Sequence, residues 1–196
     1  MSDTSDTPKA LSGIRVIDFS RIVAGPHCTM CLADLGADVI KIEDTGKGDD
    51  LRNHKPPHIE CDSPYFLSLN RNKQSIAIDM AAPEGRDVIL ELLSEADVLV
   101  ENFRTGVMEK FGFGYESLKN RFPKLVYCSI SGYGREGSQK SRAAYDPIVQ
   151  AESGQMATNG SVESGPMRTG LAVTDTQTGH FAVQGILAAL FARERS

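Results

Sequence analysis

The sequence predicts an α/β fold, a Rossmann-like and mostly parallel sheet with helices on both faces. Three observations predict it. Short β-rich runs alternate with helical stretches, as strands and crossover helices do in parallel sheets. Proline and glycine stand at the expected ends of helices. With 196 residues, 40% of them hydrophobic and 24% charged, the chain can bury the core that such a sheet needs.

The first half of the chain supplies three predicted strands and the first helix. Residues 14–19 form a β-rich run, and residues 25–35 follow as a helix with Pro26 in its first turn and Gly36 at its end. A second strand comes next, and a polar loop then leads to Tyr65 and to a third strand. These two strands are residues 38–43 and 75–79.

The second half continues the alternation. Pro83 opens a helix whose apolar residues recur at helical spacing. These apolar residues are Val88, Ile89, Leu92 and Leu93. Strands are expected at residues 97–101 and 125–130, with one or two short helices between them that break at Gly112 and Gly114.

Ligands of open parallel sheets bind at the edge where the strands end. We therefore expect a site among the loops that follow four of the predicted strands. These loops are residues 20–25, 44–52, 102–106 and 131–134. None of them carries the glycine fingerprint of a dinucleotide site or of a P-loop, so neither kind of nucleotide site is expected.

Composition narrows the class of partner. The net charge of −5 and the lack of a long basic stretch argue against nucleic acid. No apolar run approaches the roughly 20 residues that span a bilayer, so no membrane partner is expected. Residues 1–10 are polar and acidic, unlike a secretory signal, and are predicted to be a flexible arm ahead of one unit at residues 11–196.

The four cysteines raise the question of a redox or metal site. Cys28 and Cys31 form a C-x-x-C beside His27, which is typical of a redox pair or of half a metal site. Cys61 and Cys128 stand apart, so a second ligand pair is missing and no metal site is predicted. The use of cysteine in this sequence indicates a reducing compartment, the cytoplasm or an organelle matrix.

One carboxylate stands out near the end of the chain. Asp175 follows an apolar stretch and precedes an Ala-rich helical segment. Backbone N–H groups and the helix dipole favour negative charge at such a position. Position alone therefore supports two interpretations, a helix N-cap or a functional carboxylate.

Several segments together resemble the family III CoA-transferases, in order along the chain. The matching segments are residues 13–20, 24–26, 35–43, 48–50, 70–76, 100–106, 128–134, 144–146 and the stretch around Asp175. The resemblance implies that Asp175 is a nucleophile. It would attack an acyl-CoA to give a mixed anhydride and then an enzyme-bound CoA thioester. A backbone N–H near Ala24 would stabilise the oxyanion. Coenzyme A would be a substrate, and no permanently bound cofactor is implied.

The resemblance also assigns residues that bind coenzyme A. Asn102, Lys110 and Phe111 match positions near the CoA, and Tyr133 matches an active-site tyrosine. Lys110 suits a phosphate as a point charge but is equally compatible with a solvated surface lysine. Tyr133 is also compatible with a strand-end aromatic whose hydroxyl is satisfied. Two further cations would either bind phosphate or solvate a loop. They are Arg71 and Lys73.

Substrate preference follows from departures near the site. The positions that differ from the formyl-CoA transferase pattern are Arg21, Val23 and Ser131. They argue against formate and oxalate. Residues 70–79 and 172–178 are similar to the transferases that use succinate or related dicarboxylates, and this resemblance favours such an acid as substrate. The racemase branch of the superfamily is an alternative, but it needs a histidine base where this chain has Tyr145, beside Asp146. We expect Asp146 to hold its loop.

The length of the chain leaves a second hypothesis open. Members of this family are much longer, with a second, smaller domain that this chain lacks, and their subunits pair as interlocked rings. A chain of 196 residues would not form that ring. It would then be a truncated or split protein that is inactive alone. The expected partner is a second copy of the chain or a separate polypeptide that supplies the second half.

Overall fold

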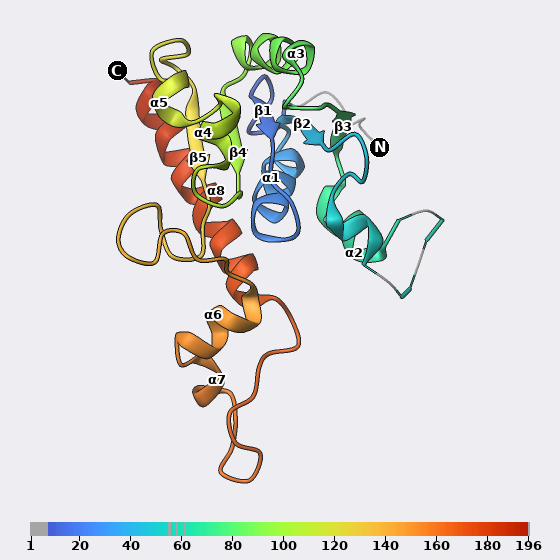
Figure 1. The fold of residues 1–196 in the computed structure, drawn as a ribbon, viewed down its shortest axis with the longest axis vertical. Helices are drawn as coiled ribbons and strands as arrows, with labels where there is room; N and C mark the ends of the chain where they lie inside the picture. The colour runs from blue at the N-terminus through green and yellow to red at the C-terminus, as the bar shows by residue number, and fades with distance from the viewer. Residues whose placement is uncertain (1–7, 55, 58, 61, 196) are drawn as a thin grey trace, which may run out of the picture.

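A five-stranded parallel sheet forms the centre of the fold (Figure 1), in a computed structural model that describes residues 8–54, 56–57, 59–60 and 62–195. The strands are β1 (Arg15–Asp18), β2 (Asp38–Glu43), β3 (Lys73–Ala77), β4 (Val98–Glu101) and β5 (Val126–Ser129). Their order is β3-β2-β1-β4-β5. The predicted Rossmann-like fold is confirmed. From β1 the chain adds β2 and β3 on one side of the sheet, and β4 and β5 then lie on the other side. The loops after the neighbouring strands β1 and β4 therefore lead to opposite sides and leave room for a site between them.

One face of the sheet is covered by two helices that are far apart in sequence. They are α1 (Ala24–Asp34) and α8 (Val173–Arg193), which lie side by side. Leu32 of α1 and Ile186 of α8 share a buried cluster with Val16 of β1 and Val98 of β4. This packing fixes the start of α8 relative to the start of α1.

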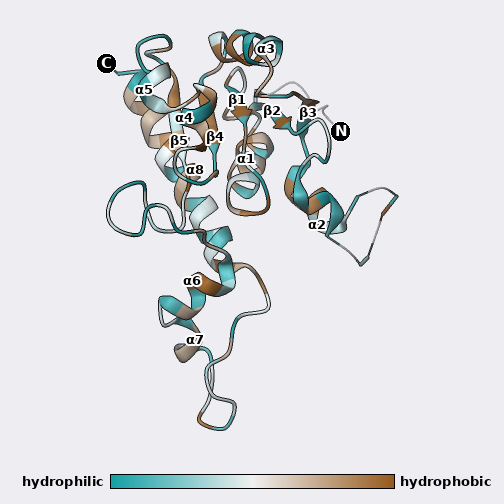
Figure 2. Cartoon of the chain, in the orientation of Figure 1, coloured by the Kyte–Doolittle hydropathy of each residue, from teal (hydrophilic) through white to brown (hydrophobic). Residues whose placement is uncertain are grey.

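The other face carries α3 (Pro83–Ser94), α4 (Val107–Phe111) and α5 (Tyr115–Leu118). Its cluster includes Ile17 of β1, whose side chain points away from that of Val16 because strand side chains alternate. Hydrophobic and hydrophilic bands alternate along α3, as its spacing predicts (Figure 2). The predicted break also holds. Gly112 ends α4 with a φ of 81°, a left-handed conformation that favours glycine.

Two short helices lie where the sequence predicts only a polar loop. They are the 3-10 helix η1 (Asp50–Asn53) and α2 (Pro64–Asn70). The hydroxyl of Ser63 accepts a hydrogen bond from the N–H of Phe66, and Pro64 occupies the first turn. Ser followed by Pro is a helix-start signal, so the sequence did carry it.

The remaining helices project from the sheet. They are α6 (Asp146–Glu152) and α7 (Gln155–Thr158), which lie below the sheet in Figure 1. Of the predicted N-terminal arm, residues 1–7 lie outside the described residues, and residues 8–10 are exposed. No helix of the described chain combines the length and apolar character needed to cross a membrane.

The close approach of α8 to α1 depends on Gly179. A Cβ at this buried position would lie 2.8 Å from the backbone oxygen of Ala24 and 2.9 Å from the ring of His27. The backbone oxygen cannot move without moving α1. Glycine is therefore what lets the first turns of α8 lie against the first turn of α1.

We expect Gly179→Ala to lower the free energy of unfolding by about 1–3 kcal/mol, because the added methyl overpacks this contact. The matched control is Gly185→Ala in the same helix, where an added Cβ meets nothing within 4 Å. That control should be neutral or more stable by up to about 1 kcal/mol, since alanine favours a helix. Urea denaturation measures both. Equal losses in the two variants would contradict the assigned contact.

Candidate active site

The loop between β1 and α1 forms one wall of the candidate site and is held by side chains from three other segments. The Asn102 amide accepts a hydrogen bond from the N–H of Arg21 (2.8 Å) and donates one to its carbonyl oxygen (2.7 Å). Asp49 accepts from the N–H of Ile22 (3.1 Å), and Lys41 donates to the carbonyl oxygen of Ser20 (2.7 Å). The backbone of each of Ser20, Arg21 and Ile22 is therefore held by a side chain from another segment.

These bonds hold an unusual backbone conformation at Ile22. Its φ is +67°, and a β-branched residue rarely adopts a positive φ because its side chain then clashes with the backbone. Strain of this kind costs on the order of 1–3 kcal/mol and persists only where the surroundings enforce it. Here it directs the chain into α1, so that Ala24 begins that helix at the site.

Two buried ion pairs lie beneath the loop. Lys41 contacts Asp49 at 2.9 Å, and Lys73 contacts Asp18 at 3.1 Å. Burial raises the pKa of Asp18, but the charges of Lys73 and Lys41 and the hydroxyls around it outweigh burial and hold that pKa at about 2. Ser20 donates one of these hydroxyl hydrogen bonds. Asp18 is therefore ionised at any physiological pH.

Asp175 does not cap α8, so the N-cap interpretation is wrong. The helix begins at Val173, and Asp175 is the third residue of its first turn. The cap comes from Asp146 of α6, whose carboxylate accepts from the N–H groups of Thr174 (2.8 Å) and Asp175 (3.2 Å). It also accepts from the Thr174 hydroxyl and from Gln150. The expectation that Asp146 holds its loop fits this position.

The Asp175 side chain is therefore left available. Within the part of the chain that the structure describes, its carboxylate accepts no hydrogen bond. Burial, and then the charge of Asp146, raise its pKa from 3.8 to about 6. A group with this pKa is mostly ionised at pH 7 but poorly solvated, which is typical of a reactive carboxylate.

Asp175 lines two adjoining clefts of about 190 and 130 Å³ at the carboxyl ends of β1, β4 and β5. Ala24, Asn102, Ser131 and Gly132 line both clefts with it. Three of the four predicted loops thus meet here. The fourth does not, because residues 44–52 follow β2, farther from β4 and β5 in the sheet order.

The N-terminus of α1 offers hydrogen-bond donors to these clefts. Val23 at the N-cap makes no side-chain capping bond, so the first N–H groups of α1 are not capped locally. The helix dipole adds partial positive charge at the same point. Ala24 and Asp175 therefore present a donor and a carboxylate to one cavity.

The cations assigned from the sequence lie elsewhere. Lys73 is buried, and its ammonium donates to Asp18, to the carbonyl oxygen of Pro26 (2.9 Å) and to Asn70 (2.9 Å). Its three N–H donors are thus used inside the protein. Arg71 pairs with Asp34 at the end of α1. Neither cation lines either of the two clefts.

Three of the remaining assigned residues, Lys110, Phe111 and Tyr133, do not line either cleft. Lys110 is exposed on α4, with its ammonium 5.7 Å from the ring centre of Phe111. Phe111 lines a separate pocket of about 90 Å³. The Tyr133 hydroxyl donates to Glu152 at 2.6 Å. Asn102 does line the clefts, although both ends of its amide are engaged by Arg21.

The structure also brings in residues that the sequence analysis missed. The basic side chains at the larger cleft are those of Arg104, Lys140 and Arg142. Arg104 lies two residues after Asn102 in a predicted loop, which was a usable signal. No sequence signal pointed to Lys140, because a long irregular segment separates it from the end of β5. Tyr65 of α2 is close enough to Asp175 for that charge to contribute to its raised pKa, after burial.

The C-x-x-C does not form a redox pair in this structure. Cys28 is buried among apolar side chains, and burial raises the pKa of its thiol far above the usual range. Cys31 is a separate free cysteine, half-buried on α1. Cys61 lies outside the described residues.

The sequence profile of CoA-transferase family III matches residues 11–196. A succinyl-CoA:glutarate CoA-transferase of Mus musculus is 46% identical over 97% of this chain and 44% of its own length. A formyl-CoA:oxalate CoA-transferase of Streptomyces coelicolor is 42% identical over 97% of this chain and 46% of its own.

A solved structure gives the same result. A CAIB/BAIF family protein from Brucella suis matches with a TM-score of 0.92 and 41% identity, over 96% of this chain and 51% of its own. The chain therefore spans about half the length of the relatives that it matches.

The raised pKa of Asp175 predicts a pH-dependent gain of stability in Asp175→Asn. The folded state binds this proton more tightly than the unfolded chain, so the wild type loses stability as pH rises from about 4 to about 6. At pH 7.5 the variant should be more stable by about 1–3 kcal/mol. At pH 4 the gain should nearly vanish.

Denaturant unfolding at the two pH values measures this difference. Asp146→Ala is the control, because losing the cap of α8 should lower stability at pH 7.5 by about 0.5–2 kcal/mol. A gain in Asp175→Asn of the same size at both pH values would contradict the assigned pKa.

Proposed function

The chain belongs to CoA-transferase family III, and we propose that it transfers coenzyme A from an acyl-CoA thioester to a carboxylic acid, with Asp175 as the nucleophile. One observation carries the proposal. The Asp175 carboxylate is not used to cap α8 and is poorly solvated, and it lines a cavity together with Ala24 at the N-terminus of α1. A carboxylate in that environment is suited to attack a carbonyl carbon whose oxygen then takes up negative charge.

The first step forms an anhydride. A carboxylate oxygen of Asp175 attacks the thioester carbonyl, and the carbonyl oxygen becomes an oxyanion in the tetrahedral intermediate. The N–H of Ala24 is the donor that we assign to this oxyanion, and such donors typically contribute about 10²–10³ in rate. Collapse breaks the carbon–sulfur bond, which leaves an acyl-aspartyl anhydride and the CoA thiolate.

The second step transfers CoA to the enzyme. The thiolate attacks the aspartyl carbonyl of the anhydride, and the donor acid leaves as a carboxylate. The acceptor carboxylate then attacks the enzyme thioester, and the same two steps run in reverse. No oxidant or additional group is consumed, and the thioester bond is conserved throughout.

The cations at the cleft suit the phosphates of coenzyme A. Among the described residues, the side chains of Arg104 and Lys140 form no ion pair, whereas Arg142 is paired with Glu152. Unpaired cations at a cleft attract an anionic ligand and can form charge-assisted hydrogen bonds with it. We assign the phosphate contacts to Arg104 and Lys140.

The acceptor that we propose is a dicarboxylate such as succinate or glutarate. The departures at Arg21, Val23 and Ser131 from the formyl-CoA transferase pattern argue against formate and oxalate. The resemblance of residues 70–79 and 172–178 to succinate-type transferases supports a dicarboxylate. The mouse relative is a succinyl-CoA:glutarate CoA-transferase, which agrees with it. A panel of acyl-CoA and dicarboxylate pairs, read by mass spectrometry for exchange of CoA, tests the assignment.

A second candidate function is that of one part of a two-part enzyme. The chain spans about half of its relatives' length, and α8 and the segment before it expose large apolar side chains. These include Leu171 (80% exposed), Phe181 (66%) and Phe191 (60%). A second copy or a separate polypeptide would cover them. Size-exclusion chromatography and a CoA-transfer assay, with and without a polypeptide matching the other half of a relative, separate the two candidates.

We expect Asp175→Ala and Asp175→Asn to abolish CoA transfer, because neither alanine nor an amide can form the anhydride. Mass spectrometry of the wild type with an acyl-CoA should detect CoA attached to the peptide that contains Asp175. Glu163→Gln, an exposed acid in the loop before α8, is the control and should retain the adduct. Full turnover by Asp175→Ala would exclude the nucleophile assignment.

Removing the cleft cations should weaken binding of coenzyme A. Arg104→Gln and Lys140→Gln are each expected to raise its dissociation constant about 3- to 10-fold, and to reduce the salt dependence of binding. Lys110→Gln is the comparison, because it removes an exposed lysine outside the clefts. If only Lys110→Gln weakened binding, the phosphates would lie on α4 instead.

A further inference from the structure

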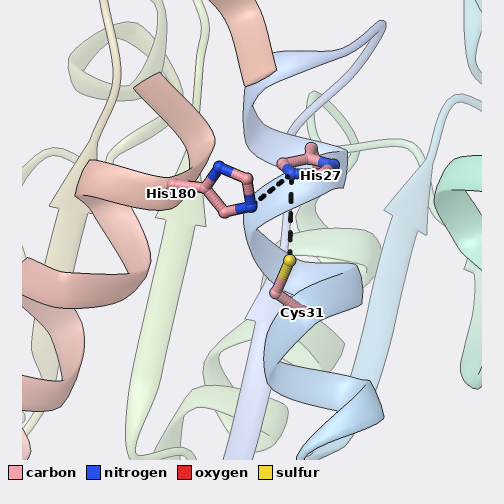
Figure 3. Close-up of side chains that lie close together, drawn as sticks. All are labelled: His27, Cys31 and His180. Atoms are coloured by element: carbon pink, nitrogen blue, oxygen red, sulfur yellow. Dashed lines mark hydrogen bonds between the residues drawn. The ribbon is translucent and has the colours of Figure 1, made fainter. Parts of the chain in front are cut away.

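A second cluster of reactive side chains lies between α1 and α8, outside the two clefts. His27 and Cys31 are four residues apart on α1 and therefore share one face of that helix. His180 reaches them from α8 (Figure 3). Sequence spacing did not predict this set, because His180 is 153 positions from His27.

The distances within the cluster suit a metal ion. The Nε2 atoms of His27 and His180 are 3.2 Å apart, and the Cys31 Sγ lies 3.9 Å from the His27 Nε2. One ligand atom from each residue lies within 4.8 Å of the others. Tetrahedral zinc places two nitrogens about 3.3 Å apart and a nitrogen about 3.6 Å from a sulfur. The His27–His180 and His27–Cys31 distances are close to these values, and the Cys31 sulfur would move toward His180 by up to about 1 Å to complete the set.

The Nε2 atoms of the two histidines also face each other. The imidazoles meet edge to face, with ring centres 4.7 Å apart and planes at 80°. Without a metal, one Nε2 must carry a proton and donate it to the other. A cation between them would use both lone pairs, while each Nδ1–H remained free to hydrogen-bond.

The surroundings allow a cation to enter. His180 is exposed, and His27 and Cys31 are half-buried. Two cations act on His27, and both are paired: Arg71 with Asp34 and Lys73 with Asp18. Imidazole and thiolate ligands favour zinc over magnesium or calcium.

We propose that His27, Cys31 and His180 form a site for a zinc-class divalent cation that ties α1 to α8. Three protein ligands leave a fourth position for water. His27 lies about one turn after Ala24, and His180 little more than one turn after Asp175. A bound ion therefore braces the two helices whose first turns form the candidate active site. This inference stands on its own geometry and does not require CoA transfer.

Zinc titration of the metal-free chain by calorimetry, with thermal unfolding alongside, tests the site. We expect one zinc per chain and a higher melting temperature with zinc, but no shift with magnesium. His180→Ala and Cys31→Ser should each lower zinc affinity about tenfold or more and abolish the shift. His54→Ala and Cys128→Ser are matched controls, a histidine and a cysteine outside the cluster, and should bind as the wild type does.

Cobalt substitution gives a readout that does not depend on how the variants fold. The wild-type chain with cobalt(II) should show a thiolate-to-cobalt charge-transfer band and the intense visible bands of four-coordinate cobalt. Absence of these bands would overturn the proposal. Zinc affinity that is the same in wild type, His180→Ala and Cys31→Ser would overturn it as well.

Discussion

The site depends on two buried ion pairs beneath the β1–α1 loop. Lys41 with Asp49 and Lys73 with Asp18 place four charges in the interior, where each would be costly if unpaired. Because every one is engaged, the loop above them is held by charged groups that cannot rearrange cheaply. That rigidity enforces the positive φ of Ile22 and sets where α1 begins. Replacing one partner would leave an uncompensated charge below the β1–α1 loop.

The second constraint is how closely α8 approaches α1. Gly179 removes the side chain that would separate them, and Asp146 supplies the negative charge that the start of α8 favours. With capping assigned to Asp146, the Asp175 carboxylate accepts no hydrogen bond from any residue that the structure describes. The raised pKa of Asp175 means that its ionised form lowers the stability of the fold, because burial removes water from the carboxylate. An unsolvated carboxylate of this kind is what a reactive site needs, at a cost in stability.

Charge is divided between the interior and the cleft. Lys73, which the sequence suggests as a phosphate ligand, is instead buried, and its ammonium contacts Asp18. Arg104, which forms no ion pair with any described residue, lies where the loops after β4 and β5 come together. The pair of helices that frames the cleft carries the proposed metal ligands on an adjoining face. The same helix contact therefore positions the Asp175 carboxylate, the N-terminus of α1 and the His–Cys cluster.

The sequence by itself determined the five strands and the helices α1, α3 and α8 in their order, because periodicity, proline and glycine act within a few residues. It left η1 and α2 as a loop. It also singled out Asp175 and Ala24, whose surroundings match a family pattern along the chain. Only the tertiary structure decided which polar groups are paired. Asp146 rather than Asp175 caps α8, Lys73 is buried, and His180 meets His27, each through a contact between distant segments. Local spacing cannot encode such contacts, because they exist only once the sheet has brought its loops and helices together.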